Sequence, residues 1–204
     1  MAPRAVLLDL LMATMNSIAI WTAAAGDRER GLAWRDAVTA RMIDAGRYVD
    51  YDGLVERAAA TLALPPNARA ELRQAWSVMQ PWPDAVALED LGVGYAFVTN
   101  CSSELAAVAV ERSGLRPMFT LAAEEAGWFK PRHEVYALAV ERLGLKATQV
   151  QFVAGAAYDA IGASNAGLST VLVRRRPVRQ PLPEQVRVAG SLTEALEGTE
   201  SGPA

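Results

Sequence analysis

The chain has 204 residues, of which 51% are hydrophobic, so it can bury a sizeable core as one domain or as a core domain with a smaller insertion. Its formal net charge is −3, and nucleic-acid-binding proteins usually carry an excess of positive charge, so we expect no nucleic-acid partner. The single cysteine, Cys101, excludes a disulfide within this chain and a zinc site built from several cysteines, and it fits a reducing, cytoplasmic compartment.

The first predicted element is a short buried strand over residues 5–8, which ends at Asp9. The apolar sequence that continues to residue 25 has the length of a signal peptide, but Asp9 and Asn16 interrupt it. A carboxylate in the middle of a membrane costs roughly 2.5–3.5 kcal/mol. We therefore expect the first strand of a sheet here, and no membrane segment.

A block of helices is predicted over residues 16–91. Leu32, Val38 and Met42 follow the 3.6-residue spacing of an amphipathic helix, and the prolines at 65–66, 81 and 83 interrupt the helical pattern. The remainder alternates between strands and helices. The predicted strands are residues 95–98, 118–121, 150–153, 170–173 and 186–188, and the predicted helices are residues 103–112, 132–143 and 157–166.

This alternation predicts a parallel sheet with helices on both faces. We expect residues 1–15 and 92–196 to form an α/β core and residues 16–91 to form a helical cap inserted into it. The polar, glycine-containing residues 197–204 are predicted to be a disordered tail.

Polar residues follow the predicted strands where each strand ends. Asp9 follows the first strand, Thr99 and Asn100 follow the second, and Lys130 and Asp159 come after later ones. The carboxyl ends of parallel strands share one edge, where ligands bind, so these side chains are expected to meet there. A carboxylate at this edge can attack an electrophilic carbon or phosphorus and form a covalent intermediate. The only histidine, His133, is expected in an exposed first turn of a helix, which disfavours triad chemistry.

These motifs resemble the haloacid dehalogenase (HAD) superfamily, and within it the L-2-haloacid dehalogenases. The apolar strand ending at Asp9 is similar to the first motif, and Thr99-Asn100 to the second. Lys130-Pro131 and residues 158–163, which contain Asp159, are similar to the later motifs. The resemblance implies an α/β, HAD-like Rossmannoid core, with a parallel sheet flanked by helices, and an inserted α-helical cap.

The resemblance also implies a hydrolase in which Asp9 is the nucleophile and forms an aspartyl ester on a small organic acid. In this interpretation Lys130 stabilises the charge of Asp9, Asp159 activates water, and Thr99 orients the nucleophile or the substrate carboxylate. The remaining implied residues bind the substrate: Arg35, Asn100, Tyr136 and Thr14. Thr14 can enter the site only if the loop after Asp9 carries one extra residue.

No cofactor or metal is expected. Leu11 and Ala156 occupy the positions at which the phosphatases of this superfamily carry acids, so a hard Mg²⁺ site is poorly supplied. The implied partner is a small-molecule substrate, and related enzymes are commonly homodimers.

Three alanines depart from the dehalogenase pattern: Ala13, Ala154 and Ala156 stand where the family has polar residues. Loss of one preorganised polar group of this kind costs about 10²–10³ in rate. An alternative therefore stays open, in which Asp9 acts as a general acid or base on a bulkier apolar substrate, as in an isomerase, a lyase or another hydrolase. A phosphatase and a non-catalytic module are less favoured alternatives.

Overall fold

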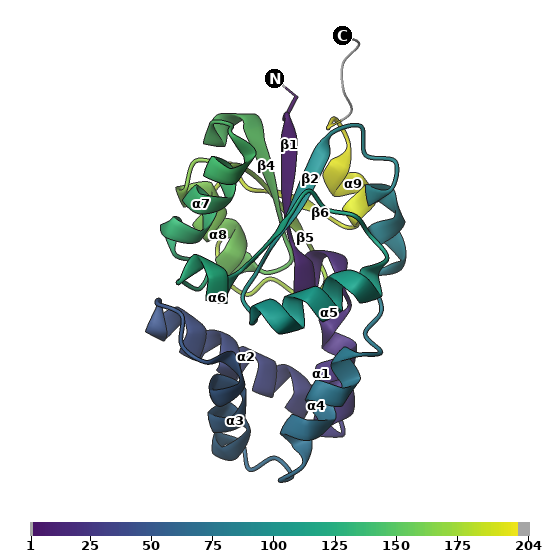
Figure 1. Ribbon diagram of the computed structural model, residues 1–204, viewed down its shortest axis with the longest axis vertical. Coiled ribbons are helices and arrows are strands. Elements are labelled where there is room, and N and C mark those ends of the chain that lie inside the picture. Colours follow the sequence, from purple (N-terminus) through teal and green to yellow (C-terminus); the bar gives the residue numbers. More distant parts are fainter. Residues whose placement is uncertain (1, 200–204) are drawn as a thin grey trace.

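The computed structural model describes residues 2–199, and its centre is a six-stranded parallel sheet in the order β3-β2-β1-β4-β5-β6 (Figure 1). The strands are β1 Ala5–Asp9, β2 Gly94–Thr99, β3 Thr120–Ala122, β4 Val150–Ala154, β5 Ser169–Val173 and β6 Arg187–Ala189. β1 lies between β2 and β4, with Asp9 paired to Val98 and Leu8 paired to Val153. The register therefore brings the carboxyl ends of these three strands together.

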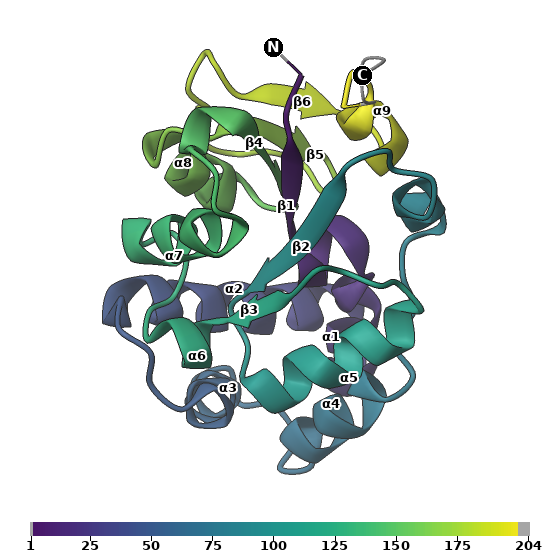
Figure 2. The ribbon, with the colours of Figure 1, turned by 45° about the horizontal axis from the view of Figure 1, so that its top comes forward.

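Helices cover both faces of the sheet (Figures 1 and 2). Val6 and Leu8 of β1 belong to the hydrophobic cluster on the face of α5 and α9, and Leu7 belongs to the cluster on the face of α7 and α8. Strand residues are apolar on both sides because both faces are buried. The helices after β2 are α5 Ser103–Ser113, α6 Ala123–Ala126, α7 His133–Leu143, α8 Ala157–Asn165 and α9 Leu192–Leu196, with a 3₁₀ turn, η3, at Ala147–Gln149.

Four helices are inserted between β1 and β2, and they lie beyond the carboxyl ends of the strands (Figure 1). They are α1 Ser17–Ala25, α2 Arg28–Ala45, α3 Tyr51–Thr61 and α4 Ala68–Trp76, and residues 17–76 are called the helical insertion below. The 3₁₀ turn η2, Pro83–Leu88, follows. Asp27 and Asp50 cap α2 and α3 by accepting hydrogen bonds from backbone N–H groups of the first turn.

The two connections to the helical insertion run side by side. Met15 and Pro81 form an antiparallel bridge, and the N–H of Asn16 donates to the carbonyl of Gln80 at 2.9 Å. The N–H of Trp82 donates to the carbonyl of Thr14, also at 2.9 Å. The chain thus leaves and re-enters the sheet domain at one place.

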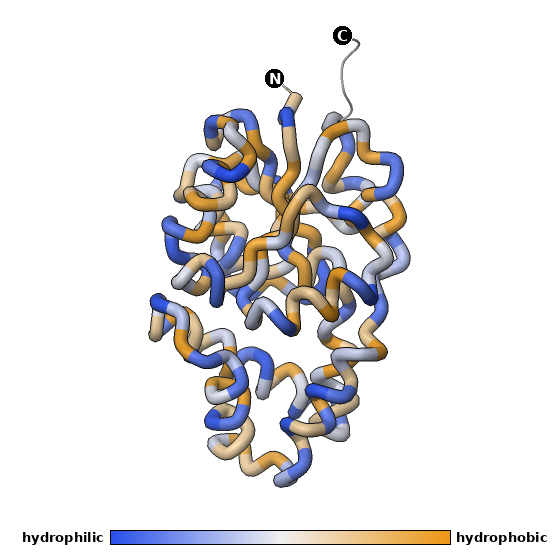
Figure 3. Tube along the Cα trace, viewed as in Figure 1, coloured by the Kyte–Doolittle hydropathy of each residue, from blue (hydrophilic) through white to orange (hydrophobic). Residues whose placement is uncertain are grey.

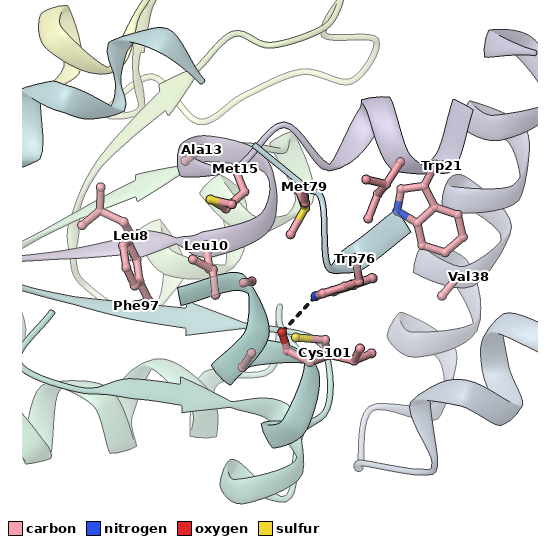
Figure 4. Close-up of a cluster of buried hydrophobic side chains, with 14 of the residues drawn as sticks. Leu8, Leu10, Ala13, Met15, Trp21, Val38, Trp76, Met79, Phe97 and Cys101 are labelled. Atoms are coloured by element: carbon pink, nitrogen blue, oxygen red, sulfur yellow. Dashed lines mark hydrogen bonds between the residues drawn. The ribbon is translucent and has the colours of Figure 1, made fainter. Parts of the chain in front are cut away.

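One hydrophobic cluster runs from the sheet into the helical insertion. It joins Leu8 and Phe97 of the sheet to Trp21 and Trp76 of the insertion (Figure 4). The indole N–H of Trp76 donates to the carbonyl of Leu105 at 2.9 Å, so this buried polar group is satisfied across the junction. Apolar residues concentrate along the strands, and polar ones on the outer turns of the helices (Figure 3).

The structure confirms the predicted α/β fold and most predicted elements. The strand predicted over residues 118–121 is shorter, because pairing with β2 begins at Thr120 and the side chain of Met118 is exposed. The short helices α6 and α9 were not predicted. No helix among residues 2–199 is long and apolar enough to span a membrane. Of the predicted tail, residues 200–204 lie outside the described residues.

Candidate active site

The ammonium group of Lys130 is the centre of a buried ionic cluster at the carboxyl edge of the sheet. Its Nζ donates to Asp9 Oδ1 at 2.9 Å, to the carbonyl of Val98 at 2.9 Å and to Asp159 Oδ2 at 2.6 Å. Burial by itself lowers the pKa of Lys130, but Asp159 and Asp9 outweigh it and raise that pKa overall. Lys130 is therefore a cation that is held between two carboxylates.

Asp159, in the first turn of α8, is fully buried and bound on both oxygens. Besides Lys130, it accepts a hydrogen bond on Oδ1 from the hydroxyl of Tyr136 at 2.7 Å. Burial raises the pKa of Asp159 to about 6, against the opposing effect of Lys130 and the hydrogen bond from Tyr136. Burial first, and then Asp159, raise the pKa of Tyr136 well above its usual value, so Tyr136 is a neutral donor.

Asn100 fixes the backbone that carries Lys130. The N–H of Lys130 donates to Asn100 Oδ1 at 2.7 Å, and Asn100 Nδ2 donates to the carbonyl of Lys130 at 3.0 Å. The Lys130–Pro131 peptide bond is cis. The turn after β2 that carries Asn100 and the loop after α6 that carries Lys130 are thus joined by a reciprocal pair of hydrogen bonds.

The turn after Asp9, η1 Leu10–Thr14, is of the π type. The N–H of Met15 donates to the carbonyl of Leu10 at 2.8 Å, which is one residue more than an α-turn spans. Asp9 Oδ2 accepts the N–H of Met12 at 3.1 Å, and the hydroxyl of Thr14 donates to the carbonyl of Asp9 at 3.3 Å. The hydroxyl of Thr14 thus binds the backbone of Asp9, and its role in substrate binding stays a prediction.

A small cavity of about 30 Å³ lies next to Asp9, between the sheet edge and the helical insertion. Of the predicted site residues, Asp9, Arg35 and Asn100 line it. The five others are buried beside the cavity or behind it and do not line it: Thr14, Thr99, Lys130, Tyr136 and Asp159.

Four polar residues line the cavity that the sequence had not indicated: Ser17, Thr39, Tyr51 and Tyr158. All but Thr39 are adjacent to a residue that could have drawn attention to them. Ser17 and Tyr51 directly follow the helix caps Asn16 and Asp50, and Tyr158 directly precedes Asp159.

The hydroxyl of Thr99 points to the thiol of Cys101, with 3.5 Å between Oγ1 and Sγ. Burial raises the pKa of Cys101 to about 12, so the thiol is neutral and unsuited to nucleophilic chemistry. Thr99 therefore has a partner other than the cavity, and its predicted role toward the nucleophile or a substrate carboxylate stays a prediction.

A second cavity, of about 380 Å³, adjoins the first and shares Arg35, Thr39 and Tyr158 with it. Ala156 lines this second cavity, as does the basic segment 174–176. Arg176 makes a bidentate ion pair with Asp36 of α2, at 2.6 and 2.8 Å, which connects the sheet domain to the helical insertion.

The comparisons with known proteins agree with this geometry. Residues 85–173 match the family model of haloacid dehalogenase-like hydrolases. An (S)-2-haloacid dehalogenase of Xanthobacter autotrophicus is 33% identical over 140 residues, which are 64% of this chain and 55% of the relative. The (S)-2-haloacid dehalogenase 4A of Burkholderia cepacia is 32% identical over 111 residues, 52% of this chain and 48% of the relative. The matched part thus spans about half the length of these relatives.

The chain is therefore similar in sequence to the HAD superfamily. The crystal structure of the L-2-haloacid dehalogenase from Xanthobacter autotrophicus with chloropropionic acid covalently bound has the same fold, with a TM-score of 0.80 at 20% identity. The comparison covers 95% of this chain and 97% of that one. The predicted resemblance to this superfamily and the predicted fold class are confirmed.

The protein YfnB from Bacillus subtilis, which has a similar fold with a TM-score of 0.81, is bound to magnesium in its crystal structure, but the residues of this site do not suit a hard cation. Asp9 and Asp159 both bind the ammonium of Lys130, so a divalent cation placed between them would meet a positive charge. Within residues 2–199 no cluster of three or more His, Cys, Asp or Glu side chains could hold a metal ion. Apolar or small residues, Leu11 and Ala156, occupy the positions of the phosphatase acids.

Proposed function

We propose that this protein is a dehalogenase-type hydrolase that acts on a small 2-halocarboxylic acid through an aspartyl ester on Asp9. The observation that carries the proposal is the placement of Lys130. Its ammonium binds the side chain of Asp9 at the wall of a small cavity and connects it to a second carboxyl group, that of Asp159. This arrangement suits a nucleophile that must be anionic and must be regenerated.

In the first step an oxygen of Asp9 attacks C2 of the substrate. The new C–O bond forms as the C2–halogen bond breaks, and the halide leaves with the electron pair. Arg35 and Asn100 line the same cavity and supply the N–H groups that receive the departing halide. Displacement from the rear inverts the configuration at C2.

In the second step the oxygen of a water molecule adds to the Cγ carbon of the Asp9 ester. The ester bond breaks, the 2-hydroxyacid leaves, and Asp9 keeps one oxygen from water. The proton released overall is taken up by Asp159, whose pKa of about 6 suits a base that works near neutral pH. Tyr136 and Lys130 hold Asp159 in place for this role.

The helical insertion acts as a cap in this proposal. It contributes Arg35 to the cavity and covers the carboxyl edge of the sheet, so it excludes bulk water from the reaction.

The experiment is halide release from (S)- and (R)-2-chloropropionate by the wild type and by Asp9→Asn. We expect release from the S acid that is lost in Asp9→Asn and kept in Asp44→Asn, an exposed carboxylate on α2 that serves as the matched control. A single turnover in ¹⁸O-labelled water is expected to put the label in Asp9 and not in the product. Absence of release from both acids would refute the proposal.

A second candidate function rests on the larger adjoining cavity. Its volume of about 380 Å³ favours a bulkier substrate, on which Asp9 would act as a general acid or base. Mass spectrometry separates the two candidates, because only the first produces a protein carrying the mass of an aspartyl ester.

A further inference from the structure

The hydroxyl of Ser17 is buried without a hydrogen-bond partner among residues 2–199, and Ser17 lines the cavity next to Asp9. The residue is 1% exposed. Buried polar atoms of native proteins almost always have a partner, so each exception calls for a physical reason. A hydroxyl that faces a cavity has such a reason when a ligand in the cavity completes its hydrogen bonding.

Tyr51 offers a second hydroxyl to the same cavity from α3. Its ring packs against Trp76, with 6.3 Å between the ring centroids, and the residue lines the cavity. Burial is the main cause that raises the pKa of Tyr51, so the phenol is a neutral donor. Ser17 and Tyr51 therefore present two O–H donors on the side of the cavity formed by the helical insertion.

On the side of the cavity formed by the sheet domain, the polar lining residues besides Asp9 are Asn100 and Tyr158. The amide of Asn100 is already bound to the backbone of Lys130, and the hydroxyl of Thr99 is directed to Cys101. A substrate carboxylate next to Asp9 must be held by donors, because it would otherwise be buried beside a like charge. Ser17 and Tyr51 supply hydroxyl donors from the helical insertion.

We propose that Ser17 and Tyr51 bind the carboxylate group of the substrate by donating their hydroxyl hydrogens to its oxygens. This inference rests on the proposed function, and it assigns the recognition of the acid to the helical insertion in place of the loops of the sheet domain.

Thr22 provides a matched control for the test. It lies on the same helix as Ser17, and its hydroxyl is also buried without a partner, but it does not line the cavity. Replacing either residue by alanine removes an unsatisfied polar group, so neither variant is expected to melt at a lower temperature than the wild type. A difference between them in ligand binding then reports on the cavity and not on the stability of α1.

The experiment measures the binding of propionate, and of neutral propionamide, by calorimetry to the wild type, Ser17→Ala, Tyr51→Phe and Thr22→Ala. Loss of one hydrogen bond to a carboxylate weakens binding by about 10- to 100-fold, so we expect this loss for propionate in Ser17→Ala and Tyr51→Phe. Thr22→Ala should bind propionate like the wild type, and the amide should bind weakly to all four proteins.

Equal affinity of Ser17→Ala and the wild type for propionate would overturn the inference, as would a wild type that binds no propionate. The two proposals also fail separately. If the wild type binds propionate through Ser17 but releases no halide, the carboxylate subsite stands and the dehalogenase proposal is refuted. If the wild type and Ser17→Ala both release halide with the same KM, the dehalogenase proposal stands and the subsite is refuted.

Discussion

Replacing Tyr136 by phenylalanine tests whether Asp159 is the group that takes up the proton during ester hydrolysis. The change removes the hydroxyl that donates to Asp159 Oδ1 at 2.7 Å, and it keeps the ring, which packs edge-on against Phe152 with 5.3 Å between centroids. Gross packing is therefore unchanged, and the effect falls on the ionised form of Asp159, which the hydrogen bond stabilises.

The size of the effect follows from the strength of that hydrogen bond. A hydrogen bond to a charged group contributes about 1.5–3 kcal/mol, and 1.36 kcal/mol corresponds to one pH unit, so the acid limb of the rate profile should move by about one to two pH units. Its removal raises the pKa of Asp159 further above its present value of about 6, so the limb moves toward alkaline pH.

The assay is the rate of halide release between pH 5 and 9. If the acid limb of the rate profile moves by about 1.5 pH units, the deprotonated fraction of Asp159 at pH 6.5 falls from about three quarters in the wild type to about one tenth in Tyr136→Phe. The wild type should then be about eightfold faster than the variant at this pH. At pH 9 both proteins should be nearly equal in rate. A loss of rate that is the same at every pH would refute the reasoning, since it would show that the titration of Asp159 does not limit turnover.

Three further substitutions test the site. Lys130→Met removes the ammonium between two buried carboxylates; chemical denaturation should show a loss of about 3–5 kcal/mol at pH 8 and a smaller loss at pH 5, because protonation relieves the unpaired charges. Gly162→Ala would place a Cβ 2.7 Å from the hydroxyl of Tyr136, so the melting temperature should fall by the equivalent of about 1–3 kcal/mol despite the better helix propensity. Gly155→Ala would drive a Cβ into the backbone of Ala13, and both stability and halide release should fall.

Gly190→Ala is the control for the two glycine variants. The nearest atom to its added Cβ is the end of the flexible Glu194 side chain, at 3.2 Å, so little change in melting temperature is expected. A stable Gly162→Ala would contradict the close packing of α8 on Tyr136. In the Lys130→Met variant, a loss of stability that does not vary with pH would contradict the ionic assignment of the cluster.

The sheet and the ionic cluster could be predicted from the sequence because both depend on strand ends. Apolar runs of strand length identify β1, β2 and β4, and in a parallel sheet the residues that follow them meet at one edge. Asp9 and Asp159 were found in this way, whereas Lys130 lies after α6 and was indicated by its resemblance to the dehalogenase motif. The structure brings both carboxylates within hydrogen-bonding distance of Lys130.

The lining of the cavity could not be predicted in the same way. Which residues of α1 and α3 face Asp9 depends on how the helical insertion packs on the sheet, and no local pattern specifies that orientation. Ser17 and Tyr51 look like ordinary first-turn residues in the sequence. The path of Thr14 depended on a single residue of turn geometry, which the π-type turn after Asp9 decides.

The adjacent connections at Met15 and Pro81 have a consequence for how such a protein can diversify. Because the chain leaves and re-enters the sheet domain at one place, segment 16–80 can be exchanged as a unit without altering the order of the strands. The exchange must keep the hydrophobic contacts between this segment and the sheet domain. The proposed reactive groups Asp9 and Lys130 belong to the sheet domain, whereas the proposed carboxylate donors Ser17 and Tyr51 belong to the exchangeable segment. Exchange of this one segment would therefore combine the same sheet domain with a different substrate-binding surface.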